Sequence, residues 1–185
     1  MYRLPIFLLG TLLLLAACGP LLEEPKATAL PPSATPEPQE QRVPLGTEVI
    51  LNEFSLRIIE VVRPADDLIA ATDDFNALPP EGEQYVLLRL SVECLNIETD
   101  CDLLWLDYHL EDDRGERYTA RLLMFGFEEQ GERVLTMDSD IRQGERVEGV
   151  IVFSVPRTVD ELVFVYSDLV VIGEPSRVVF DLSRQ

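Results

Sequence analysis

The side chains that most often serve as catalytic bases and nucleophiles are scarce in this sequence. His109 is the only histidine among 185 residues, and Cys18, Cys94 and Cys101 are the only cysteines. No serine stands in a nucleophile-elbow sequence, and no cysteine–histidine set has zinc-ligand spacing. No glycine-rich loop is suited to hold a phosphate. We therefore expect no catalytic residue and no cofactor.

The position of His109 favours a structural interpretation. It stands between Tyr108 and Leu110, in a segment over residues 104–110 in which apolar and other residues alternate. Alternation of this kind indicates a strand with one buried face. His109 belongs to the opposite face, so we expect it to face solvent.

Carboxylates are so abundant that no single pair indicates acid–base catalysis, with 34 Asp and Glu against 15 Lys and Arg. Calcium takes six to eight oxygen ligands, so acidic loops are weak candidates for a calcium site. Neither of the two acidic loops matches a dedicated calcium-binding pattern, and we favour solvated loops. The residues concerned are Glu98, Asp100 and Asp102 in one loop and Asp138 and Asp140 in the other.

Period-2 alternation predicts strands along most of the chain after residue 45. Turn signals at 112–115 and 142–145 separate them, and Pro156 should end its strand because proline cannot donate to the ladder. The best helical candidate is residues 66–71. Many short strands with turns between them predict an all-β fold, an antiparallel β-sandwich. The expected strands include residues 47–51, 54–58, 86–94, 104–110, 147–153, 162–166 and 178–180.

Three motifs carry a family resemblance over residues 46–168. They are Gly82-x-x-Tyr85-Val86, Asp113-x-Gly115-x-x-Tyr118 and Gly144-Glu145-x-x-x-Gly149-x-x-x-Phe153-x-Val155-Pro156. In this order they resemble bacterial secreted immunoglobulin-like domains of unknown function, related to the mycobacterial immunoprotective extracellular protein. The resemblance implies an immunoglobulin-like sandwich and no catalytic residues. This chain departs from the pattern by its Cys94 and Cys101 and by an unusually apolar connection over residues 122–133.

That apolar connection is the sharpest binding candidate. If it lies on a loop, it exposes a patch that a monomer rarely leaves uncovered. The alternative is an extra strand, or a loop folded onto the core. The long connection over residues 65–80 is the second candidate, since connections of that length are often functional. The candidate patch consists of Leu122, Leu123, Met124, Phe125 and Phe127.

Cys94 and Cys101 form an even pair once Cys18 is set aside. Cys94 ends one expected strand and Cys101 begins the next, so the chain between them must turn back. Such a turn can bring the two Cα atoms within the 4.4–6.8 Å that a disulfide needs. We therefore predict a Cys94–Cys101 disulfide, with two separate thiols as the alternative.

Cys18 closes a short N-terminal apolar run. The run over residues 6–15 has the length of a signal-peptide core and falls short of the ~20 residues that a spanning helix needs. Leu15-Ala16-Ala17-Cys18 resembles the lipobox of bacterial lipoproteins. The resemblance implies that residues 1–17 are a cleaved signal peptide and that acyl chains such as palmitate are attached at Cys18. An uncleaved anchor is the alternative.

The mature chain divides into a tether and one domain. Residues 18–44 are rich in proline and polar residues, which predicts a disordered, extended tether. Residues 45–185 suffice for a single sandwich domain. Removing residues 1–17 takes away one Arg and no acid, so the formal charge of −19 becomes −20. Such a charge excludes nucleic acid as a partner and repels anionic headgroups.

Together these features predict an extracytoplasmic lipoprotein, anchored by its N-terminal lipid in the cell membrane or outer membrane. We expect its domain to bind a protein or another cell-envelope component without catalysis. One alternative is a structural subunit of envelope assembly that pairs through a sheet edge. The other is a carboxylate-based secreted hydrolase or its accessory domain.

Substitution of Cys18 tests the anchor. Cys18→Ala should leave the precursor without acyl chains, because the acyl-accepting thiol is gone. Metabolic labelling with a fatty-acid probe measures this directly. Label that persists on the Cys18→Ala protein would contradict the lipoprotein interpretation.

Overall fold

The computed structural model describes residues 39–103, 106–122, 124–136, 140–168 and 176–182. The predictions for the signal peptide, Cys18 and most of the tether lie outside these residues, as do those for Leu123 and Asp138. No helix among the described residues has both the length and the apolar character needed to cross a membrane.

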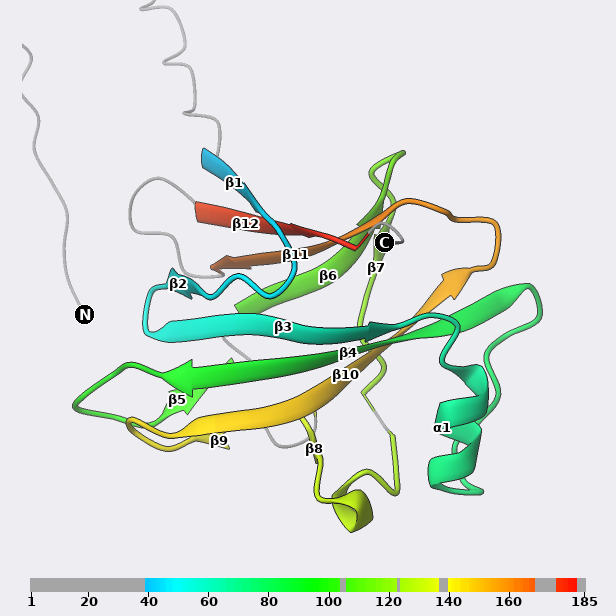
Figure 1. The fold of residues 1–185 in the computed structure, drawn as a ribbon, viewed down its shortest axis with the longest axis horizontal. Helices are drawn as coiled ribbons and strands as arrows, with labels where there is room; N and C mark the ends of the chain where they lie inside the picture. The colour runs from blue at the N-terminus through cyan, green and yellow to red at the C-terminus, as the bar shows by residue number, and fades with distance from the viewer. Residues whose placement is uncertain (1–38, 104–105, 123, 137–139, 169–175, 183–185) are drawn as a thin grey trace, which may run out of the picture. The chain divides into compact units, whose positions relative to one another are not determined.

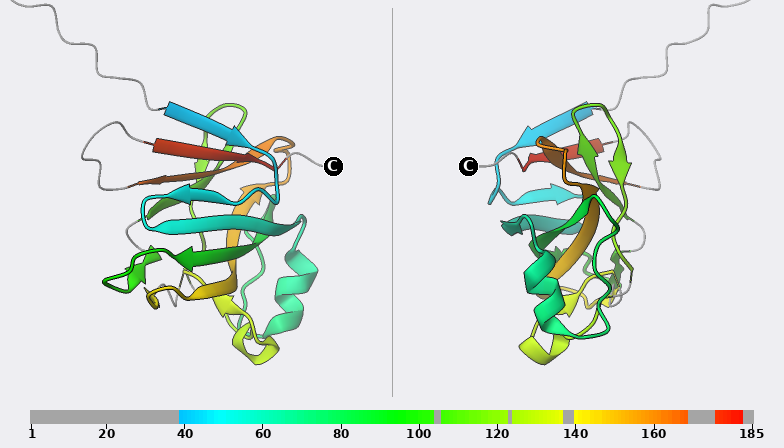
Figure 2. Two further views of the ribbon diagram at one scale, coloured as in Figure 1. Left: turned by 60° about the vertical axis from the view of Figure 1, so that its left-hand side comes forward. Right: turned by 90° about the vertical axis from the view of Figure 1, so that its right-hand side faces the viewer.

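Two five-stranded sheets face each other (Figures 1 and 2). The first sheet has the order β1 (Gln39–Val43), β12 (Ser176–Asp181), β11 (Leu162–Asp168), β6 (Leu106–Asp112) and β7 (Arg117–Tyr118). The second has the order β2 (Val49–Leu51), β3 (Phe54–Val62), β4 (Glu83–Cys94), β10 (Arg146–Pro156) and β8 (Arg133–Val134). A small ladder joins β5 (Cys101–Asp102) to β9 (Asp140–Ile141).

This arrangement confirms the predicted all-β sandwich. Most neighbouring strands are antiparallel, but β1 pairs with β12 and β8 pairs with β10 in parallel. We predicted antiparallel pairing throughout. The exceptions arise at sheet edges, between strands that are not joined by a hairpin and are therefore free to pair in either direction.

The first sheet begins earlier than the predicted domain start at residue 45. β1 lies inside the stretch that we assigned to the tether, and its residues pair with β12 from Gln39↔Ser176 to Val43↔Phe180. Val43 is buried in the core between the sheets. The edge strand of the first sheet is therefore β1, whose largely polar sequence does not alternate in the way that predicts a strand.

The main core fills the space between the sheets, as the alternating pattern predicts. Phe164 of β11 packs edge-on against Phe153 of β10, with ring centroids 6.3 Å apart. The ring centroid of Phe180, on the neighbouring strand β12, lies 6.2 Å from that of Phe164. All three rings are fully buried, so aromatic contacts join both sheets at the centre of the sandwich.

A second, smaller core covers the outer face of the second sheet. Helix α1 (Asp66–Thr72), close to the predicted 66–71, packs here through Ile69. The segment after β7, which includes the short helix η2 (Glu128–Gln130), packs beside it. β10 is therefore apolar on both faces, as expected of a central strand. The buried members are Ala65, Ile69, Tyr85, Leu87, Met124, Phe127, Val134, Val150 and Val152.

The predicted disulfide is confirmed. Cys94 ends β4 and Cys101 begins β5, and their Cα atoms are 5.7 Å apart. Both side chains are buried. The bond closes the loop that carries Glu98 and Asp100 and fastens it to the end of the second sheet.

Removing the bond should destabilise the domain modestly, because it closes a short loop with a sequence separation of 7. The chain-entropy model gives about 2.5 kcal/mol for such a loop. We expect the double variant Cys94→Ala, Cys101→Ala to lose about this free energy of unfolding in urea titrations. Reduced wild-type protein is the control and should lose a similar amount. An unchanged unfolding midpoint in both samples would refute the expectation.

Candidate functional site

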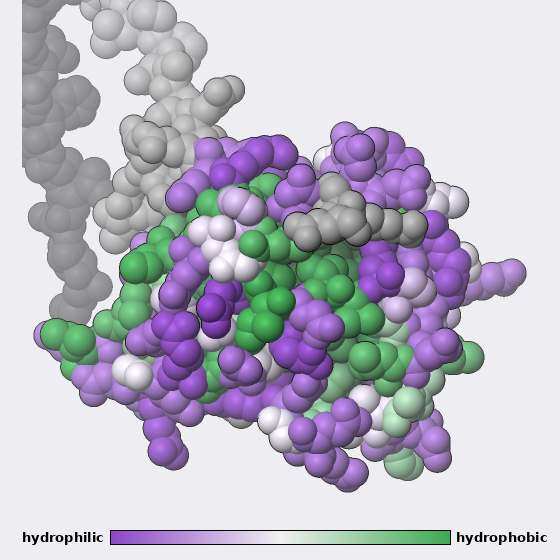
Figure 3. Space-filling model, in the orientation of Figure 1, coloured by the Kyte–Doolittle hydropathy of each residue, from purple (hydrophilic) through white to green (hydrophobic). Residues whose placement is uncertain are grey.

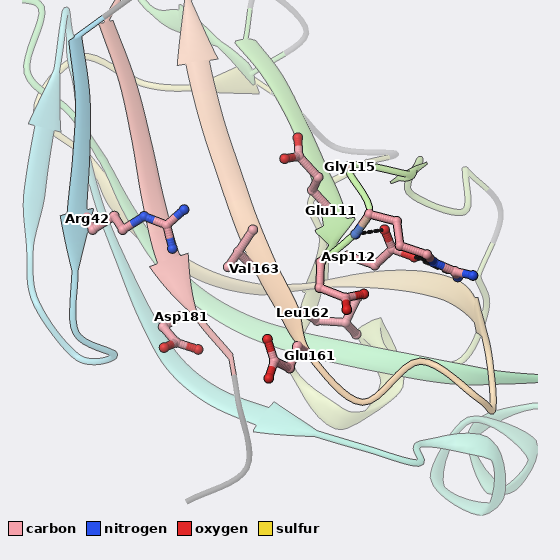
Figure 4. Close-up of a pocket in the computed structure, with 10 residues that line it drawn as sticks. Arg42, Glu111, Asp112, Gly115, Glu161, Leu162, Val163 and Asp181 are labelled. Carbon is pink, nitrogen blue, oxygen red and sulfur yellow. Dashed lines mark hydrogen bonds and ion pairs between the residues drawn. The ribbon is translucent and has the colours of Figure 1, made fainter.

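A charged cleft of about 540 Å³ opens at one end of the first sheet. Figure 4 shows Arg42 and Asp181 on one side and the turn around Asp112 on the other, with Val163 between them. Glu111 and Glu161 add two further carboxylates to the lining. No described lining residue is a histidine, cysteine or serine, so the cleft supplies charge without a nucleophile.

Asp112 has a structural role beside this cleft. Its Oδ1 accepts the backbone N–H groups of Arg114 and Glu116, both at 2.9 Å. Its Oδ2 accepts the Arg114 guanidinium at 2.9 Å and the Tyr118 hydroxyl at 3.1 Å. Burial raises the pKa of Asp112, but these hydrogen bonds outweigh it and lower the pKa to about 2. The ionised carboxylate therefore holds the β6–β7 turn and has no spare lone pair aimed at a ligand.

His109 does not face solvent, which corrects our prediction. It is 4% exposed, although it lies on the outer face of the first sheet. The reason is an ion pair that crosses this face. Arg177 of β12 donates to Glu111 of β6 at 3.0 Å and so reaches over the intervening strand β11, where Val165 pairs with His109. These long side chains cover apolar surface that would otherwise be open to water.

The imidazole of His109 sits between two carboxylates without a close hydrogen bond to either. Its Nδ1 is 3.7 Å from Asp107 and its Nε2 is 3.6 Å from Glu111. Nε2 is buried and has no hydrogen-bond partner. Burial lowers the pKa of His109, and Arg117 lowers it further, while Asp107 and Glu111 oppose the shift. At neutral pH the ring is therefore uncharged.

The described residues around His109 do not form a nucleophilic triad. Such a triad needs the serine hydroxyl on the histidine and the carboxylate behind it. Here the Ser167 hydroxyl lies 3.3 Å from the carboxylate of Asp107 instead. The group is better described as a polar network across the outer face of the first sheet.

The weak calcium candidates are brought only partly together. Asp102 and Asp140 are paired across the β5–β9 ladder, and Asp100 accepts a hydrogen bond from the Gln143 N–H at 2.9 Å. Glu98 is exposed at the tip of the disulfide loop. Within the described part of the chain, no three Asp, Glu, His or Cys side chains are grouped as metal ligands.

The apolar segment after β7 is divided between core and surface. Met124 and Phe127 are buried in the second core, which matches the alternative of a loop folded onto the domain. Leu122 and Phe125 are 68% and 40% exposed. The buried side chains anchor the segment, and the other two are displayed.

Asn76 fixes this segment against the connection that follows α1. Its side-chain oxygen accepts the Phe125 N–H at 2.9 Å, and its amide donates to the Phe125 carbonyl at 3.0 Å. The same amide donates to Thr72 Oγ1 at 2.8 Å. Gly126 makes the close approach possible, because a Cβ there would lie 2.3 Å from the Thr72 carbonyl oxygen and its φ is +82°.

Both of these loops display apolar side chains. Phe75 and Leu78, on the connection after α1, are 85% and 73% exposed. Figure 3 shows hydrophobic residues across the middle of the visible face and, mixed with hydrophilic ones, at its α1 end. The length of this connection was evident in the sequence, but nothing there singled out Phe75 or Leu78. We call the following residues the apolar loop surface: Leu68, Phe75, Leu78, Leu122 and Phe125.

The lowered pKa of His109 should appear in the pH dependence of stability. The unfolded chain binds the proton more readily, so the stabilising contribution is complete above about pH 6.5 and is lost as pH falls towards the folded-state pKa. We expect His109→Gln to remove this part of the pH dependence. Urea titrations from pH 8 to pH 5 measure the free energy of unfolding at each pH. If this free energy changes with pH equally in the wild type and the variant, the assignment is wrong.

Comparisons with known proteins concern the fold alone. Neither a protein-family model nor a curated protein matches the sequence. An uncharacterised β-sandwich protein of Clostridium difficile 630 is 12% identical with a TM-score of 0.51, over 82% of this chain and 99% of that one. A functionally unknown protein of Listeria monocytogenes EGD-e is 13% identical with a TM-score of 0.52. The match covers 75% of this chain and 82% of that one. MPT63, a secreted protein of Mycobacterium tuberculosis, is 14% identical over 80% and 99%, with a TM-score of 0.47.

Proposed function

We propose that this protein is a non-catalytic interaction module, held outside the cytoplasm by an N-terminal lipid, and that the apolar loop surface is its contact site. The observation that carries the proposal is the exposure of large apolar side chains on loops that are fixed from behind. Phe75 projects beside Asn76, whose hydrogen bonds hold both loops in place.

This exposure is not a by-product of a small core. The domain already buries two separate apolar clusters, and Met124 and Phe127 complete the second one. Phe75 and Leu78 add nothing to either cluster. Exposed apolar side chains gathered in one region are a recurrent mark of an interaction site.

The rigidity of the loops favours binding. Ordering a loop on association costs free energy, and this cost lowers the affinity that the interface can reach. Asn76 ties the two loops together, and the Tyr85 hydroxyl donates to the Ala77 carbonyl at 2.9 Å. The contact side chains are therefore presented on a backbone that is already ordered.

The cellular setting rests on the cysteines. A disulfide between Cys94 and Cys101 fits an oxidising compartment outside the cytoplasm. The lipobox-like sequence ending at Cys18 supplies the anchor in this proposal, and the proline-rich tether supplies the reach. A contact surface carried on a tether can search for a partner near the membrane while its location stays fixed.

The alternatives are less well supported. Pairing through a sheet edge favours long, open edge strands, but β2, β7 and β8 contain only three, two and two residues, and β1 alone among the four edge strands reaches five. A carboxylate-based hydrolase would need a converging acid and base. In the charged cleft Asp112 is fully engaged by the turn that it holds.

Site-specific photo-cross-linking tests the proposal in cells that produce the full, lipidated chain. A photoreactive phenylalanine analogue at Phe75 should give discrete cross-linked products with a partner protein. The control position is Ile97, which is 81% exposed at the opposite end of β4 and should give none. Cross-links that are absent at Phe75, or that are identical at both positions, would overturn the proposed contact site.

A further inference from the structure

We infer that the partner bound at the apolar loop surface is a protein whose contact segment is cationic and amphipathic, with apolar side chains bordered by Lys or Arg. This inference rests on the proposed function and adds the chemistry of the partner. It follows from the acids in the two loop stretches and from a comparison with the acids on the sheets, several of which are paired with arginines.

The two stretches that form the apolar loop surface contain acids and no basic residue, while the exposed Arg121 stands directly before Leu122. Neither residues 65–82 nor residues 122–132 contain a single Lys or Arg. Both stretches contain acids that are exposed to solvent and stand within a few residues of the exposed apolar side chains in the sequence. The exposed acids are Asp67, Asp74, Glu81, Glu128 and Glu129.

These five acids differ from most acids on the sheets in that no described residue forms an ion pair with them. On the sheet faces, Arg146 pairs with both Glu48 and Glu93, and Arg89 pairs with both Glu60 and Glu132. Even Asp66, on α1 itself, is paired with Arg157 on the side towards β4. Among the described residues, no cation therefore neutralises the border acids by an ion pair.

An uncompensated charge beside an apolar area selects partners by sign. Exposed charges steer a partner of opposite sign towards the site and raise the association rate, and they repel partners of like sign. Anionic lipid headgroups are therefore disfavoured as occupants. The apolar side chains supply affinity at short range, so a partner must match both the apolar centre and the acidic border.

Binding of a designed peptide probe tests this chemistry. The protein is the full mature chain with Cys18→Ser, so that no lipid competes for the probe. The probe is an amphipathic helical peptide of leucine and lysine, and fluorescence anisotropy measures its affinity. We expect binding that weakens steeply with rising ionic strength. We expect none for a scrambled peptide of the same composition or for a leucine–glutamate peptide.

Matched variants separate this site from the overall negative charge. The double variant Phe75→Ser, Phe125→Ser should weaken probe binding about tenfold or more, because it removes the apolar centre. The triple variant Asp74→Asn, Glu81→Gln, Glu128→Gln should weaken it severalfold.

The control triple changes the net charge equally but lies elsewhere on the surface. It is Asp113→Asn, Glu148→Gln, Glu161→Gln, and it should bind the probe as the wild type does. Equal losses in the two triples, equal binding of the scrambled peptide, or no binding at all would overturn the inference. So would binding of the unacylated chain to zwitterionic or anionic lipid vesicles through Phe75 and Phe125.

The two proposals can fail separately. If cross-linking at Phe75 captures a partner whose contact segment lacks basic residues, the inference about its chemistry is wrong and the interaction site stands. If Phe75 gives no specific cross-link, the proposed contact site itself is wrong.

Discussion

The structure depends on covering both faces of the paired strands β4 and β10. Every residue of β10, from Arg146 to Pro156, is paired with β4. The inner face packs against the first sheet, and the outer face carries a second row of fully buried residues such as Val150 and Leu87. Leaving that row in water would forfeit the free energy of its burial, so a further layer must form over it.

The further layer explains the exposed residues beside it. It consists of α1 and the segment after β7, which contribute Ile69, Met124 and Phe127 to the second core. Two short segments from distant parts of the chain must then be held against each other at the surface. Asn76 provides that contact through its hydrogen bonds to the backbone of Phe125. Phe125, which stands between the buried Met124 and Phe127, is turned outwards as a consequence.

Local patterns predicted what depends on local sequence. Alternation located the long strands, and the positions of Cys94 and Cys101 at the ends of successive strands predicted the turn that brings the two thiols together. The helix at residues 66–72 was also expected close to its observed place. The burial of His109 could not be read this way, because it depends on Arg177, a residue from a strand two positions away in the sheet. β1 was missed for the same reason, since it gains its strand conformation by pairing with β12.

Acidic residues are placed differently on the sheets and near the apolar loop surface. Apart from His109, all basic residues in the described ranges are arginines, and several of those on the sheets pair with carboxylates of other strands, as Arg146 does with Glu93 and Arg177 with Glu111. Arginine suits this task because its planar guanidinium can bond two carboxylates at once. On the sheets, then, acids are partly neutralised and help to cover apolar surface. Around the apolar loop surface, Asp66 and Glu132 are paired with arginines, but the five exposed border acids have no ion-pair partner among the described residues, so their negative charge is available to another molecule.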